Sequence, residues 1–178
     1  DYFITRVQGD DLDQPFYGMA HEIAHSWWGG MTRGAEGVRG QAFLSESLAN
    51  YSGMMVTERT YGVEAARRVY DFQMNRYLAQ RGRMGRDVPL LQVTDQPWIF
   101  YGKGAVVMYL LRDYIGADAV NAALRRYFEK HRDGVPPYPT SLDLHAELQS
   151  VTPDSLHYLL TDLFETVTLW DVSATRAT

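Results

Sequence analysis

Two histidines spaced four residues apart constrain this chain more than any other feature. His21 and His25 enclose the segment His-Glu-Ile-Ala-His, and residues at i and i+4 lie on one face of a helix. Both imidazoles can therefore reach one ion, and the HExxH pattern is typical of zinc sites. Glu22 lies at the rim of that face, where its carboxylate can take a proton from the attacking water. The pattern predicts a helix with two zinc ligands and a general base.

A catalytic zinc takes three protein ligands and keeps one position open. Glu46 is the best candidate for the third ligand because it lies on the next predicted helix, whereas Glu36 lies in a Gly-rich segment that would hold it poorly. We therefore expect one Zn²⁺ per chain, bound by His21, His25 and Glu46. Asn50 stands one helical turn after Glu46. It is either an acceptor for the free N–H of a ligand histidine or an ordinary surface residue.

Apolar periodicity, capping residues and Gly or Pro breaks predict a mainly α chain. Asp13 is expected to cap the first helix, which has Pro15 in its first turn, and Gly62 to end the second. The expected helices cover about 14–28, 41–61, 63–80, 103–115, 117–131, 141–149 and 153–166, after a short strand at 2–7. Residues 167–178 lose the helical period. We expect them to form a tail or the start of a further domain.

Composition limits the classes of function. A length of 178 residues is most simply one domain, and the net charge of −5 gives no basic surface for nucleic acid. The absence of cysteine excludes disulfides and thiol catalysis. The apolar runs are too short to cross a bilayer, so we expect this piece to be soluble. Because the first residue is Asp1, we expect a segment of a longer protein.

Two segments carry a resemblance to a known family. His21 to Gly29 reads HEIAHSWWG and Phe43 to Tyr51 reads FLSESLANY; together they resemble the gluzincin aminopeptidases of the aminopeptidase N family. The resemblance implies the helical half of a thermolysin-like zincin catalytic domain, with Glu46 as third zinc ligand. Tyr101 to Gly104 reads YGKG and is similar to the family's YxKG segment, which implies that Tyr101 hydrogen-bonds the tetrahedral intermediate.

Three departures from the family pattern stand beside this resemblance. The twenty residues 26–45 between His25 and Glu46 are two more than the family's usual spacing. Ser45 and Ser47 replace the usual Asn and Gly beside the third ligand. The GxMEN-type motif that binds the substrate amine is absent. We therefore expect residues 1–166 to be an N-terminally truncated zinc metallopeptidase domain.

A narrower resemblance concerns the parent protein. Leu44 to Ala49, Tyr138 to Ser141 and Val151 to Leu156 are similar to bacterial proteins that fuse such a peptidase domain to an ABC-transporter-type permease. This resemblance implies a bacterial parent tethered to a membrane.

The predicted reaction is zinc-dependent hydrolysis of a peptide bond, with a peptide as partner and removal of N-terminal residues as the expected outcome. One alternative is a zinc endopeptidase, which needs no amine-binding carboxylate. Another is a non-catalytic zinc-containing module that binds peptides or regulates a transporter, although the intact Glu22 speaks against it. A purely structural zinc site is a third alternative, but three ligands beside a general base favour an open catalytic position.

Overall fold

The computed structural model describes residues 12–168, and this part of the chain is mainly α, as predicted, with no β-strand. The strand predicted at 2–7 lies outside the described residues. No helix in the described range is both long and apolar enough to cross a bilayer. The helical elements, including the short η turns, are α1 (Gln14–Ala24), η2 (Phe43–Ser47), α2 (Leu48–Tyr61), α3 (Val63–Gln80), η3 (Leu90–Gln92), η4 (Trp98–Lys103), α4 (Gly104–Ile115), α5 (Ala117–His131), α6 (Ser141–Gln149), η5 (Asp154–Leu156), α7 (His157–Leu160) and η6 (Thr161–Glu165).

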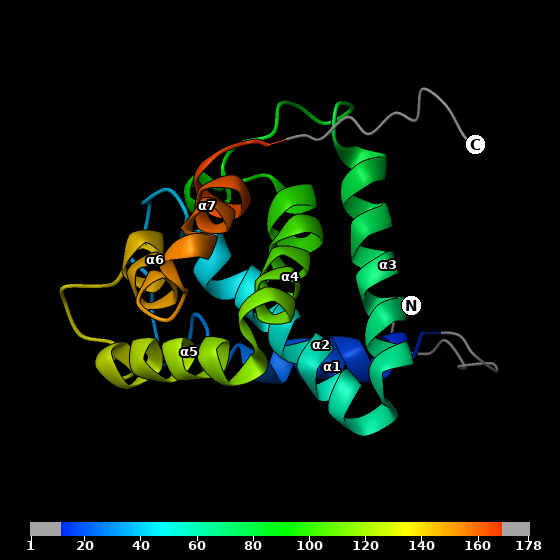
Figure 1. Cartoon of the computed structure of the whole chain (residues 1–178), viewed down its shortest axis with the longest axis horizontal. Coiled ribbons are helices and arrows are strands. Elements are labelled where there is room, and N and C mark those ends of the chain that lie inside the picture. The colour runs from blue at the N-terminus through cyan, green and yellow to red at the C-terminus, as the bar shows by residue number, and fades with distance from the viewer. Residues whose placement is uncertain (1–11, 169–178) are drawn as a thin grey trace.

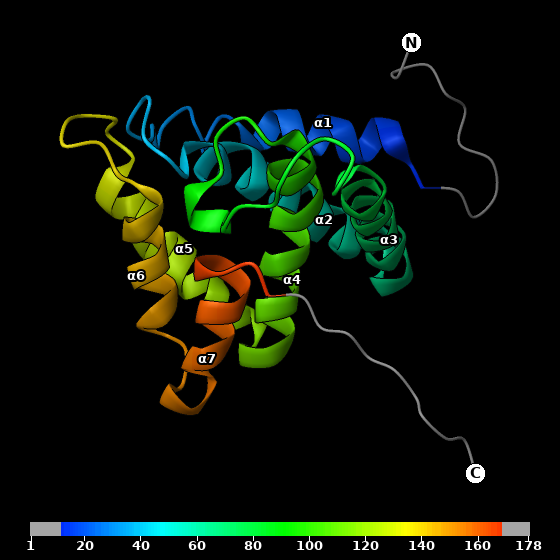
Figure 2. The same ribbon diagram turned by 90° about the horizontal axis from the view of Figure 1, so that it is seen from above.

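Helix α4 stands at the centre of the molecule. Helix α3 lies on one side of it, and α5, α6 and α7 gather on the other side (Figure 1). Helices α1 and α2 pack against each other, with α1 on the outer side in the second view (Figure 2). Because α2 also packs against α3 and α4, α1 is joined to the central helix through α2.

Local signals explain where several helices begin and end. The Asp13 side chain accepts a hydrogen bond from the backbone N–H of Phe16 at 3.0 Å and caps α1. Gly62 has a φ of 87°, which a residue with a side chain rarely adopts, and it separates α2 from α3. Thr140 and Asp143 form a reciprocal capping box at the start of α6. These signals act over a few residues, so they can be read from the sequence.

The main core surrounds α4. Met108 and Leu111 from this helix are fully buried against Leu44, Leu48 and Tyr127 from its neighbours. Burial of one large apolar side chain stabilises the fold by about 1.5–3 kcal/mol. A second, smaller cluster consists of Tyr17, Met54 and Val69, one each from α1, α2 and α3. It ties the helix with the histidine pair to the next two helices.

Several predicted helices differ from the structure in their bounds or type. The segment predicted as one helix at 153–166 consists of η5, α7 and η6. Helix α1 ends at Ala24 and not near Trp28, and turns follow up to Gly29, which has a φ of 91°. The helix expected from residue 103 begins earlier, with the π-helical turn η4 at Trp98. The helix expected at 41–61 also contains a π-helical turn, η2. Such turns are wider than α-helical ones and often occur at functional sites.

Candidate metal centre

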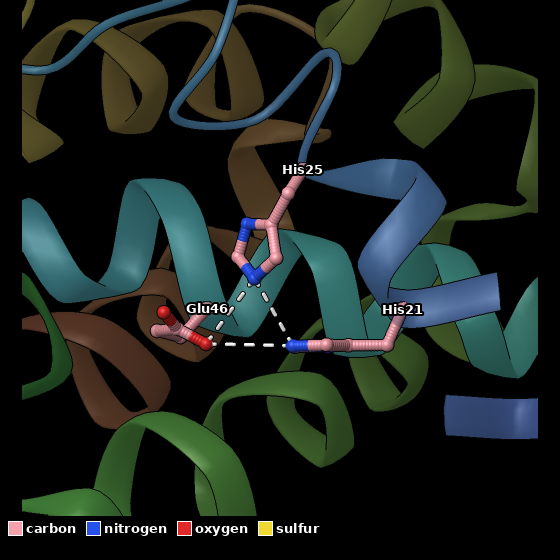
Figure 3. A group of neighbouring side chains, drawn as sticks. All are labelled: His21, His25 and Glu46. Carbon is pink, nitrogen blue, oxygen red and sulfur yellow. Dashed lines mark hydrogen bonds and ion pairs between the residues drawn. The ribbon is translucent and has the colours of Figure 1, made fainter. Parts of the chain in front are cut away.

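The last turn of α1 and its C-cap residue, His25, bring both histidines to one point. His21 and His25 lie one turn apart, and their Nε2 atoms are 3.1 Å from each other (Figure 3). The His21 side chain is 10% exposed and that of His25 is 28% exposed, so the pair is largely shielded from solvent but still reachable. The helical period predicted from the sequence accounts for this arrangement.

Glu46 reaches the same point from the π-helical turn η2. Its Oε2 atom lies 3.4 Å from Nε2 of His21 and 3.4 Å from Nε2 of His25 (Figure 3). Burial raises the pKa of the Glu46 carboxyl, but the neighbouring His21 and His25 imidazoles and the Tyr101 hydroxyl outweigh it, so the pKa falls below its usual value. Glu36, the other acid considered, instead forms an exposed ion pair with Arg33.

The three side chains fit a zinc ion. Ligand atoms at about 2.0–2.1 Å from a tetrahedral zinc lie about 3.3 Å from one another, and the distances between the three atoms here are 3.1, 3.4 and 3.4 Å. Oε2 of Glu46 is buried without a hydrogen-bond donor, as expected of an atom that faces a cation. Two imidazoles and one carboxylate are also a donor set that zinc enzymes use. His21, His25 and Glu46 could therefore hold the metal.

Glu22 stands beside this group without joining it. Its side chain is exposed and, with His21, lines a cavity of about 810 Å³ between α1, α2, α3 and η4. The other residues that line this cavity are Gln14, Tyr17, Gly18, Asn50, Phe72, Gln73, Asn75, Arg76, Gln80 and Tyr101. This volume is within the usual range for small-molecule sites. Of the three candidate ligands, His21 lines the cavity, so a substrate there would lie beside His21 and Glu22.

Tyr101 is brought to the same cavity by the π-helical turn η4. Its ring centroid lies 6.1 Å from that of His21, and the guanidinium carbon of Arg76 lies 4.6 Å from its ring centroid. Burial, followed by the negative charge of Glu46, raises the pKa of the Tyr101 hydroxyl to about 12. The hydroxyl therefore keeps its proton at neutral pH and can donate a hydrogen bond.

Asn50 makes no hydrogen bond to a ligand histidine and, at 4% exposed, is not a surface residue, so both alternatives were wrong. Its amide oxygen accepts a hydrogen bond from the Tyr17 hydroxyl at 2.8 Å, and Nδ1 of His25 lies 3.1 Å from the backbone oxygen of Trp28. A proton on Nδ1 shared with that carbonyl would leave the Nε2 lone pair free for a metal.

Sequence reasoning gave no sign of the Trp28 carbonyl as a partner, because any residue type can supply a backbone acceptor. It also missed Arg76, which no local pattern links to Tyr101.

The mainly helical fold and the His–His–Glu group are those expected of the helical part of a metallopeptidase catalytic domain. Residues 10–160 match the Peptidase family M1 domain, and the chain belongs to this family. It is 31% identical over 124 residues to Aminopeptidase RNPEPL1 of Mus musculus and of Homo sapiens; each match covers 63% of this chain and 17% of the relative. The chain thus spans about a sixth of these relatives. No solved structure matches it significantly.

Proposed function

We propose that this protein hydrolyses peptide bonds with a zinc ion held by His21, His25 and Glu46, and that it removes N-terminal residues from peptides. The observation that carries the proposal is the triangle of ligand atoms, 3.1–3.4 Å on each side, beside a cavity that Glu22 and Tyr101 also line. Membership of family M1 and the two aminopeptidase relatives support the same chemistry.

Each residue has a separate role in the proposed reaction. A zinc ion, when bound, polarises the scissile carbonyl and makes water more acidic. Glu22 accepts a proton from the attacking water and returns it to the leaving amine. Tyr101 donates a hydrogen bond to the oxyanion that develops on the carbonyl oxygen, a contact whose loss typically costs about 3–4 kcal/mol. Its raised pKa keeps it a donor throughout the physiological range.

Three alternatives are a structural zinc site, a module that only binds peptides, and an endopeptidase. A structural zinc site is closed by four protein ligands, whereas this group has three and borders a cavity of about 810 Å³. A module that only binds peptides has no need of a base, yet Glu22 lines the same cavity. An endopeptidase would use the same residues; the names of the two relatives favour the aminopeptidase.

The decisive experiment uses the full-length protein purified without chelator. We expect one zinc per chain by metal analysis, and loss of that zinc in His21→Ala and in His25→Ala. Glu22→Gln should keep the zinc and lower kcat at least about 10²-fold, because the amide preserves shape but cannot accept the proton. Stoichiometric zinc in both histidine variants, or activity of Glu22→Gln close to that of the parent, would refute the assignment.

A second assay separates aminopeptidase from endopeptidase. We expect a peptide with a free N-terminal amine to be cleaved and its N-acetylated analogue to resist, since an aminopeptidase uses the amine to position the scissile bond. Glu22→Gln is the control for contaminating peptidases. Efficient cleavage of the acetylated peptide would establish the endopeptidase instead.

We also propose that the parent protein is tethered to a membrane through an ABC-transporter-type permease. The support is the resemblance at Leu44 to Ala49, Tyr138 to Ser141 and Val151 to Leu156. Fractionation of cells that express the full-length protein tests this proposal. Recovery in the membrane fraction, resistant to high salt, is expected, and recovery in the supernatant alone would contradict it.

A further inference from the structure

Two buried side chains join the turn that carries Glu46 to the turn that carries Tyr101. The Ser47 hydroxyl, next to Glu46, donates a hydrogen bond to the backbone oxygen of Phe100 at 2.8 Å. The Asn50 amide, one turn later, donates to the backbone oxygen of Tyr101 at 3.1 Å. Ser47 is 0% exposed and Asn50 is 4% exposed, so water does not compete for these two bonds.

The contact between the two turns is very close. A Cβ atom built on Gly104, which follows η4, would lie 2.0 Å from Oγ of Ser47 and 2.4 Å from its Cβ. The absence of a side chain at Gly104 therefore allows the Ser47 hydroxyl to reach η4. Two hydrogen bonds to backbone carbonyls, together with the close contact at Gly104, restrict movement of η4 relative to η2 and α2. These bonds hold the backbone from which the Tyr101 side chain extends.

The same network extends to the helix of the histidine pair. Asn50 accepts a hydrogen bond from the Tyr17 hydroxyl at 2.8 Å, and the Tyr17 oxygen accepts one from the Gln73 amide at 2.8 Å. Tyr17 precedes His21 by four residues on α1, so it lies one turn before this ligand. Asn50 of α2 thus links α1 and η4, because its amide oxygen accepts from Tyr17 and its amide nitrogen donates to Tyr101.

We propose that Ser47 and Asn50 are positioning residues that hold Tyr101 at the place where the oxyanion develops. The inference rests on the proposed function, since it assumes that Tyr101 acts in hydrolysis. Ser47 stands where the resembled family pattern has Gly, so this hydroxyl is a feature of this chain's own sequence. Neither residue touches the reacting atoms; both act through Tyr101.

The test compares two matched serines in the full-length protein. Ser141 is also buried, its hydroxyl donates to the Leu91 backbone oxygen at 2.7 Å, and a Cβ on Gly40 would lie 2.2 Å from Oγ of Ser141. Its hydrogen bond goes to a residue outside the candidate metal centre. Ser47→Ala should lower kcat about tenfold with KM and zinc content nearly unchanged, because a small displacement of a catalytic group has a large effect on rate. Ser141→Ala should leave kcat unchanged despite a similar loss of thermal stability.

A double-mutant cycle shows whether Ser47 acts through Tyr101. In the Tyr101→Phe background, Ser47→Ala should cause no further loss of kcat. Asn50→Asp, which keeps an acceptor for Tyr17 but loses the donor to the Tyr101 carbonyl, should behave in the same way. A full additional loss in the Tyr101→Phe background, or equal kcat values for Ser47→Ala and Ser141→Ala, would overturn the proposal.

Hydrogen exchange gives a readout that does not depend on activity. In substrate-free protein, the backbone amides of residues 98–104 should exchange faster in Ser47→Ala than in the parent or in Ser141→Ala. If the parent protein does not hydrolyse peptides, the proposed function fails, and exchange alone still decides whether Ser47 holds this turn. Equal exchange rates in the three proteins would show that it does not.

Discussion

Tyr101 is the residue whose protonation the candidate site controls most clearly. Burial and the negative charge of Glu46 raise its pKa to about 12, while the Arg76 guanidinium over its ring opposes the shift. A raised pKa means that the neutral phenol, which is the hydrogen-bond donor, persists until the pH approaches about 12. Tyr101 should therefore not contribute an alkaline limb to the pH profile of hydrolysis near neutrality.

Tyr101→Phe tests this role. We expect kcat to fall about 10²–10³-fold, while KM and zinc content stay nearly unchanged, because a donor to the oxyanion acts in the transition state and not in the ground state. The kcat profiles of parent and variant should run parallel between about pH 6 and pH 8, since a tyrosine hydroxyl stays protonated in this range. An unchanged kcat would assign Tyr101 a structural role only.

At the scale of elements, close approaches at glycine decide how the helices meet around the site. Gly102 packs on α3, where an added Cβ would lie 2.9 Å from the Cβ of Tyr77. Gly104 packs on Ser47 at a still shorter distance. The YGKG segment thus carries two glycines for packing on two different elements, in addition to the tyrosine that the family resemblance singles out.

Gly104→Ala should destabilise the protein by about 1–3 kcal/mol, because the new methyl group overlaps the fully buried Ser47. This cost exceeds the gain of about 0.5–1 kcal/mol that Ala brings to a helix interior. Gly18→Ala on α1 is the control, since an added Cβ there meets nothing within 4 Å. This variant should show only the stabilisation that Ala brings to a helix. Urea unfolding of both variants gives the comparison; equal stabilisation by the two substitutions would contradict the packing argument.

At the scale of the whole molecule, one ion pair links α2 to the central helix, α4. Arg112 of α4 donates two hydrogen bonds to the Glu58 carboxylate of α2, at 2.7 and 2.8 Å. The hydrogen bonds from Arg112 hold the pKa of Glu58 below its usual 4.5, despite partial burial. A lowered pKa in the folded state stabilises the fold above the unfolded pKa, and this contribution disappears as the pH falls through the folded value.

Glu58→Gln should therefore lower the melting temperature at pH 7 and have little effect below the lowered pKa of Glu58. The expected loss is about 1 kcal/mol or less because both side chains keep some contact with solvent, which corresponds to about 2–4 °C for a domain of this size. Glu36→Gln is the control, since Glu36 pairs with Arg33 on an exposed surface outside any helix and should change little. A difference between parent and Glu58→Gln that persists at low pH would exclude this explanation.

The sequence by itself determined the features that depend on neighbours a few residues away. The spacing of His21 and His25 places them on one face of α1, and the Asp13 cap sets the start of that helix. The bounds of α3, α5 and α6 agree with those predicted, because Gly62, Gly116 and the Pro-rich segment before α6 act locally. Family membership was also recognisable, since short motifs around these elements carry it.

Only the tertiary structure decided how residues far apart in the chain meet. Asn50 bonds Tyr17 and Tyr101, thirty-three and fifty-one residues away, and not a histidine. The Ser47 hydroxyl reaches Phe100 because Gly104 leaves room for it. The π-helical turns η2 and η4 carry Glu46 and Tyr101, whose side chains both lie near His21. These contacts depend on the packing of whole helices against one core, and no local pattern of residue types encodes that packing.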